Sequence, residues 1–148
     1  MTEDLRNPKR LIYSSSPDRG LATLLELWPE IREAEPEAEL KIFYGFKNLD
    51  MAAAASPELA TVGRRIRHQV RSLPGVEECG RVSGNRLAGE MLRAGVWAYP
   101  TWFAETSCIS AMEAQAAGLF IVTSPGAALN ETVGERGQMI TTKSYPFD

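Results

Sequence analysis

The sequence has few of the residues that build disulfide-bonded, metal-binding or nucleic-acid-binding proteins. It contains two cysteines, Cys79 and Cys108, whose spacing fits no metal-ligand motif, and His68 is its only histidine. The single histidine excludes a multi-histidine metal site, and free thiols are typical of a reducing cytoplasm. The net charge of −3 argues against nucleic-acid binding, which favours a basic face. We therefore expect a cytoplasmic protein with no nucleic-acid partner.

Long apolar runs are also missing. No stretch approaches the length of a membrane span, and the N-terminus, MTEDLRNPKR, lacks the apolar centre of a signal peptide. The dinucleotide motif Gly-x-Gly-x-x-Gly is absent after the first expected strand, where the sequence reads SSSPDRG. The length of 148 residues, with 44% hydrophobic and 24% charged residues, is typical of one globular domain with a substantial core.

Strand-like and helical segments alternate along the chain. Strands are expected over residues 10–15, 39–45, 76–82, 96–102, 119–124 and 137–142, after a flexible lead-in over residues 1–9. Helical spacing of apolar residues fills most of the intervals; we expect Pro29 to kink or restart the first helix, and Gly95 to cap a helix over residues 85–94. The pattern predicts an α/β fold: a single Rossmann-like domain over residues 10–148, with a parallel sheet of about six strands and helices on both faces.

Three polar turns follow expected strands and should meet at one edge of the sheet. They read SSPDRG, FAETS and SPGAALNE, and ligands of parallel sheets bind at the carboxyl ends of the strands. The second turn opens a small-residue helix, and the start of a helix attracts anions through its free N–H groups and dipole. Glu105 and Glu113 flank this start, at most about 12 Å apart if the whole span is helical. That spacing suits a nucleotide-sugar, with hydroxyls at both ends and diphosphate between.

The segment AYPTWFAETSCISAMEAQAAGLFIVTS, followed by GAALNETVGERG, resembles the donor-binding domain of retaining glycosyltransferases, in particular glycosyltransferase family 4 of the GT-B class. The likeness runs from Arg10 to the end. It implies the second half of a GT-B fold, so the N-terminal acceptor domain of the parent enzyme is expected to be absent from this chain. It also implies transfer of a hexose from a nucleoside diphosphate sugar to an acceptor hydroxyl, with membrane contact only through the parent enzyme.

The resemblance assigns roles to side chains along the donor. Glu105 should hold hydroxyls of the hexose, and Arg19 should grip the diphosphate; we take both as the catalytic residues. Glu113 should hold the ribose. Ser14 occupies a position where a charged phosphate contact is usual in the family. Neither metal nor other cofactor is expected, because the sequence has no Asp-x-Asp pair.

The resemblance also assigns backbone contacts and two flanking residues. The loop at Val82 should lie against the base, and Glu131 is placed facing the donor. The N–H groups that should meet the sugar and diphosphate belong to Ser107, Cys108, Ile109 and Ser110. Cys108 stands where the family usually has glycine.

Two other classes of function stay open on the residues alone. One is a dinucleotide enzyme, which the missing glycine motif disfavours. The other is a non-catalytic nucleotide-binding or interaction domain of Rossmann or flavodoxin-like shape. A receiver domain of that shape needs an acidic cluster at the strand ends, whereas the first strand here ends in serines. We expect the isolated domain to bind donor weakly and to transfer little, because the cleft lacks its other wall.

Overall fold

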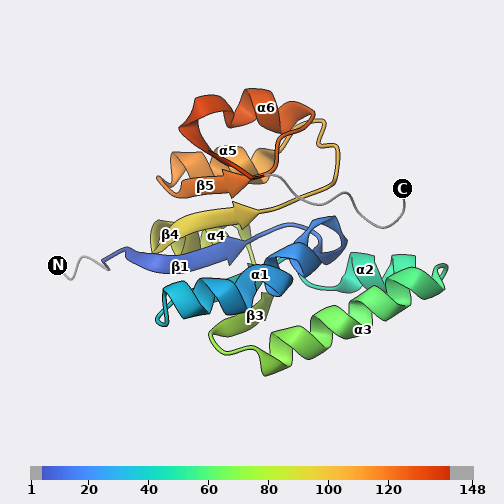
Figure 1. The fold of residues 1–148 in the computed structure, drawn as a ribbon. Helices are drawn as coiled ribbons and strands as arrows, with labels where there is room; N and C mark the ends of the chain where they lie inside the picture. The colour runs from blue at the N-terminus through green and yellow to red at the C-terminus, as the bar shows by residue number, and fades with distance from the viewer. Residues whose placement is uncertain (1–4, 141–148) are drawn as a thin grey trace.

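Strands and helices alternate along residues 5–140, which are the residues that the computed structural model describes, except that two helices follow the second strand (Figure 1). The strands are β1 (Asn7–Tyr13), β2 (Glu39–Phe43), β3 (Val76–Gly80), β4 (Ala94–Tyr99), β5 (Phe120–Thr123) and β6 (Gly137–Met139). The helices are α1 (Leu21–Ala34), α2 (Lys47–Ala53), α3 (Pro57–Ser72), α4 (Gly84–Leu92), α5 (Ile109–Ala116) and α6 (Ala128–Thr132), with short 3-10 turns at Pro17–Arg19 and Gly134–Arg136.

The sheet is parallel throughout and confirms the predicted fold class. Its strand order is β3-β2-β1-β4-β5-β6, and every neighbouring pair runs parallel. Leu11 in the central strand β1 lies opposite Leu40 of β2 on one side and Val96 of β4 on the other. The chain winds outward in both directions from β1 and β4, so the reversal between these two strands forms the crevice in which such sheets bind ligands.

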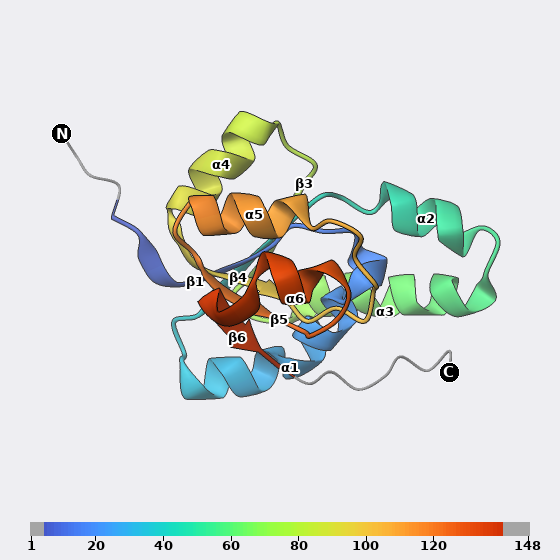
Figure 2. The same ribbon diagram turned by 90° about the horizontal axis from the view of Figure 1, so that it is seen from above.

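Helices cover both faces of the sheet, as the sequence predicts. Figure 2 shows α1 and α3 on one face and α4 and α5 on the other. This placement follows from the direction of winding, because right-handed crossovers from β1 to β2 and β3 leave one face to α1 and α3. Crossovers in the other direction then place α4 and α5 on the opposite face.

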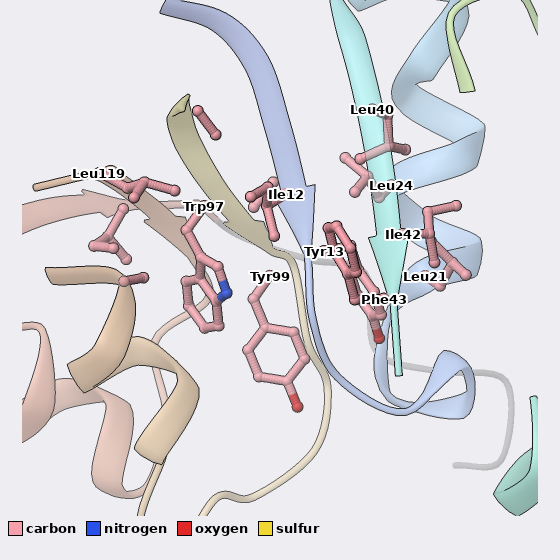
Figure 3. Packing of buried hydrophobic residues seen from close by; sticks show 14 of the residues in the cluster. Ile12, Tyr13, Leu21, Leu24, Leu40, Ile42, Phe43, Trp97, Tyr99 and Leu119 are labelled. Atoms are coloured by element: carbon pink, nitrogen blue, oxygen red, sulfur yellow. The ribbon is translucent and has the colours of Figure 1, made fainter. Parts of the chain in front are cut away.

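The core lies between these layers and is rich in aromatic residues (Figure 3). Trp97 and Tyr99 lie two residues apart on the same face of β4, and their ring centroids are 5.2 Å apart. Trp97 is fully buried, and its indole N–H donates to Ser14 Oγ at 2.9 Å. Trp28 of α1 is also fully buried and donates to the carbonyl oxygen of Pro74 at 2.7 Å. Both buried indole N–H groups are therefore satisfied, which burial requires.

The described start of the chain is more ordered than the sequence predicts. β1 begins at Asn7, within the expected lead-in, and residues 1–4 lie outside the described range. Arg6 Nη1 and Nη2 donate to the carbonyl oxygens of Ala94 (2.7 Å) and Ala117 (2.5 Å). The lead-in prediction is therefore wrong at residues 7–9, because pairing with β4 extends β1.

Two predictions about single residues need correction. The first helix does not restart at Pro29: α1 continues through it as one helix to Ala34, because core packing of its neighbours Leu25 and Trp28 outweighs the lost hydrogen bond. Gly95 does not cap a helix but lies inside β4. A Cβ atom there would stand 2.5 Å from the carbonyl oxygen of Pro8, so the close approach of β1 and β4 requires glycine.

Strand ends also differ from the prediction. β4 ends at Tyr99, before the predicted end at residue 102. β6 ends at Met139, and residues 141–142 of the predicted last strand lie outside the described range. No helix within residues 5–140 has the length and apolar character needed to cross a bilayer.

Candidate functional site

The corner after β1 and the segment after β4 lie against each other at the carboxyl edge of the sheet. Gly20 has a φ of +140°, and a Cβ atom at this position would stand 2.5 Å from the carbonyl oxygen of Pro100. The indole N–H of Trp102 donates to the carbonyl oxygen of Asp18 at 3.1 Å. The first predicted turn therefore contacts the segment that leads into the second, and only glycine permits the closest approach.

Glu105 is the buried carboxylate of this edge. Its residue is 8% exposed, and Tyr99 donates its hydroxyl proton to Oε1 at 2.5 Å. Arg19 Nη1 lies 4.0 Å from the same oxygen. Burial, and then the hydrogen bond to Glu105, raise the pKa of Tyr99 well above its usual value, so the phenol stays protonated as a donor. The carboxylate is thus held in one orientation by Tyr99 and Arg19.

Arg19 is fixed on two sides while still reaching solvent. Its guanidinium carbon lies 4.0 Å above the centre of the Phe103 ring, and its Nη1 faces Glu105. Its side chain is 37% exposed. An arginine held in this way presents its remaining donors to the edge of the sheet, where a phosphate can accept them in pairs.

The corner after β5 completes the edge, so all three predicted turns meet. The N–H of Ala128 donates to the carbonyl oxygen of Glu105 at 2.9 Å. The preceding Ala127 has a φ of +43°, which few residues other than glycine adopt. The hydroxyl of Ser124, at the end of β5, is buried and finds no hydrogen-bond partner among the described residues. An unpaired buried hydroxyl at a strand end is a candidate ligand contact.

The start of α5 lies beside Glu105 and supplies free backbone donors. α5 begins at Ile109 without a side-chain cap, and the first N–H groups of a helix have no acceptor within it. Ser110 Oγ donates to the carbonyl oxygen of Ser14 at 3.4 Å, which joins α5 to the corner after β1. Cys108 precedes the helix and is 5% exposed. Burial raises the pKa of its thiol to about 11, so the thiol is neutral at physiological pH.

Glu113 lies in a separate hollow between α4 and α5. The hollow has a volume of about 320 Å³ and is lined by Gly84, Ala88, Met91, Leu92, Glu113, Ala116 and Ala117. α5 starts at Ile109, so the span from Glu105 to Glu113 is only partly helical and the 12 Å limit for a continuous helix does not apply. Gly84 opens α4 directly after the β3 corner, so Glu113 shares its hollow with the start of α4.

The structure places the other predicted site residues at the same edge or on its flanks. Ser14 is buried, with its hydroxyl turned to Trp97. Val82 is half-buried and packs against the core beyond the end of β3. Ser107 and Ile109 are exposed beside the start of α5, and Glu131 is exposed on α6. Residues 5–140 contain no group of three or more His, Cys, Asp or Glu side chains placed to hold a metal ion.

Sequence reasoning missed two polar groups at this edge. Tyr99 was expected only as part of a strand, although it is the hydrogen-bond donor to Glu105. Its position six residues before Glu105 carries no signal, because the contact depends on how the segment folds back. Ser124 was part of a predicted turn, and only its burial without a partner distinguishes it.

Comparison with known proteins adds a family match to this geometry. The model of a family described as glycosyl transferases group 1 matches residues 8–146. A search of curated protein sequences finds no match.

Solved structures share the fold at low sequence identity. The pneumococcal O-GlcNAc transferase GtfA, in complex with UDP and GlcNAc, is 18% identical with a TM-score of 0.69; the match covers 97% of this chain and 26% of GtfA. HepE from Anabaena, in complex with UDP-glucose, is 15% identical with a TM-score of 0.69, over 93% of this chain and 36% of HepE. AviGT4, a glycosyltransferase of avilamycin A biosynthesis, is 17% identical with a TM-score of 0.68; the match covers 97% of this chain and 40% of AviGT4. The chain thus spans well under half the length of these proteins, and at these identities the likeness shows the fold.

Proposed function

The chain belongs to the group 1 glycosyl transferases, and we propose that it is the donor-binding domain of a retaining enzyme, which transfers a hexose from a nucleoside diphosphate sugar to an acceptor hydroxyl. The observation that carries the proposal is the meeting of the three strand-to-helix corners around Glu105, Arg19 and the start of α5. The structures of GtfA and HepE contain UDP with a sugar and UDP-glucose, respectively. Both ligands belong to the class that we propose for this chain.

Each part of such a donor has a complementary group at this edge. The diphosphate would accept hydrogen bonds from Arg19 and from the N–H groups of Ser107–Ser110, where the dipole of α5 favours negative charge. The hexose hydroxyls would donate to Glu105, whose carboxylate Tyr99 holds in place. The ribose would donate to Glu113 in the hollow between α4 and α5.

Three further residues flank this path. The base would lie beside Val82, at the corner that opens α4 next to the hollow of Glu113. Ser14 would donate its hydroxyl proton to the donor, because Trp97 uses only an acceptor lone pair of that oxygen. Glu131 would approach the donor from α6, which is tied to the Glu105 loop through Ala128.

The proposed chemistry rests on charge stabilisation. When the bond between the hexose and the diphosphate breaks, negative charge grows on the leaving phosphate oxygen. Arg19 and the N–H groups of α5 are positioned before this happens, and preorganised donors of that kind lower the barrier. The reaction would need no metal. The acceptor hydroxyl would attack from the face that the diphosphate leaves, and a second domain of the parent enzyme would bind that acceptor.

Calorimetry with UDP, GDP and ADP tests the proposal on this chain. We expect one of the three to bind. Glu113→Gln should weaken that binding by about tenfold or more, because hydrogen bonds to a charged group contribute about 1.5 to 3 kcal/mol each. Glu30→Gln is the matched control, because Glu30 is exposed on α1, on the opposite face of the sheet. Absence of binding by all three nucleotides to a folded sample would overturn the proposal.

A further inference from the structure

Trp102 differs from the other two tryptophans of the chain in its exposure. Trp28 and Trp97 are fully buried, whereas Trp102 is 43% exposed. An indole ring is among the largest apolar groups that a protein can bury, and leaving much of it in water gives up that stabilisation. Trp102 follows the Pro100–Thr101 segment and lies at the carboxyl edge of the sheet, beside the residues proposed to hold the donor.

The ring of Trp102 is held in place despite its exposure. Its N–H donates to the carbonyl oxygen of Asp18 at 3.1 Å. Its ring meets Phe103 edge to face, with centroids 6.1 Å apart and an interplanar angle of 77°. These two contacts fix the orientation of the indole, so a ligand that packs on it would cost little further ordering.

Contacts connect this ring to the proposed donor site. Phe103, against which Trp102 packs, lies under the guanidinium of Arg19, and Arg19 faces Glu105. Asp18, which accepts the indole N–H, immediately precedes Arg19. The ring of Trp102 is thus linked through Phe103 to the cation proposed for the diphosphate, and through that cation to the carboxylate proposed for the hexose.

We propose that Trp102 is the apolar platform on which the hexose of the donor lies, and that it makes the site selective for the nucleotide-sugar over the nucleotide alone. A pyranose ring has an edge of hydroxyl groups and a face of C–H groups. Glu105 can accept from the hydroxyls, and the indole can pack on the C–H face. This inference rests on the proposed function and adds a specificity-determining residue to it.

Tryptophan fluorescence tests the inference directly, because the buried Trp28 and Trp97 are shielded from acrylamide. Quenching by acrylamide should therefore report on Trp102, and Trp102→Phe should lose the quenchable component. The probes are the nucleoside diphosphate that binds by calorimetry and its glucose, galactose, N-acetylglucosamine and mannose conjugates. We expect at least one conjugate to protect Trp102 from quenching clearly more than the diphosphate does. Equal protection by the diphosphate and every conjugate would overturn the inference and leave the proposed nucleotide site standing.

Affinity measurements separate a platform from a structural support. Trp102→Ala should raise the Kd of the protecting nucleotide-sugar by about fivefold, a typical contribution of an aromatic contact, and leave the Kd of the diphosphate unchanged. Phe120→Ala is the matched control, because Phe120 is also exposed but lies at the start of β5. An equal rise in both Kd values would mean that Trp102 only supports the Asp18–Arg19 turn. Lack of binding by any diphosphate would instead count against the proposed function.

Discussion

Replacement of Gly20 by alanine tests how tightly the first two corners of the site are packed. Gly20 combines a φ of +140° with contact against Pro100, whose carbonyl oxygen would be 2.5 Å from an added Cβ atom. The α-carbon of Thr101 would be 3.1 Å away. Both neighbours are backbone atoms, so relief requires movement of the segment that leads to Trp102 and Glu105.

The chain provides controls that separate strain from clash. Gly126 has a nearly identical φ of +145°, but an added Cβ atom there would meet nothing within 4 Å. Gly84 also has open space and lies at the start of α4 without a positive φ. Gly126→Ala therefore measures the cost of backbone strain alone. Gly84→Ala measures the cost of replacing glycine by alanine where there is neither backbone strain nor a steric clash.

The expected order follows from these contacts. Strain should cost Gly126→Ala about 1 to 3 kcal/mol. Gly20→Ala should lower the free energy of unfolding by the same strain cost plus about 1 to 3 kcal/mol more, because its Cβ atom overpacks the corner. Gly84→Ala should be neutral or gain up to about 1 kcal/mol. Urea unfolding followed by circular dichroism measures all three free energies. A free energy of unfolding for Gly20→Ala within about 0.5 kcal/mol of that for Gly126→Ala would refute the close packing of the corners.

Two other predictions concern buried groups around the site. Ser14→Ala should cost about 1 to 3 kcal/mol in urea unfolding, because it leaves the fully buried indole N–H of Trp97 without its acceptor; no measurable loss would contradict this. Cys108 has a pKa of about 11 against a usual 9.0, so the folded state holds a proton that the unfolded state loses as the pH rises from 9 to 11. The thiol therefore contributes its full share of stability below pH 9. Between pH 8 and 10 the free energy of unfolding of the wild type should fall by about 1 kcal/mol more than that of Cys108→Ala. Parallel pH profiles of the two proteins would argue against this.

The sequence was sufficient to predict the topology because its strands carry clear apolar patterns. The segment LFIVTS opens with four apolar residues, and the structure places residues 120–123 of it as a strand paired on both sides. The site could be located for a similar reason, because parallel strands bring their carboxyl ends to one edge and each turn there contained polar residues. Arg19 and Glu105 were predicted separately and lie together.

Contacts across the fold could not be predicted in this way. The hydrogen bond from Tyr99 to Glu105 depends on the turn over residues 100–105, for which the sequence gives no periodicity. The requirement for glycine at position 95 depends on how closely β1 approaches β4. The continuation of α1 through Pro29 could not be predicted, because the local rule ignores the core contacts of Leu25 and Trp28. In each case tertiary packing, and not the local residue pattern, decided the outcome.

Amide chemical-shift mapping with the nucleoside diphosphate sugar that binds tests the central claim most directly. The account predicts that the perturbed amides cluster at the carboxyl edge of the sheet, in residues 14–20, 81–84, 102–110 and 124–131. The turns at the opposite edge, residues 35–38 and 73–75, should be unaffected. Perturbations that centre on those opposite turns, or that omit both Arg19 and the start of α5, would contradict it.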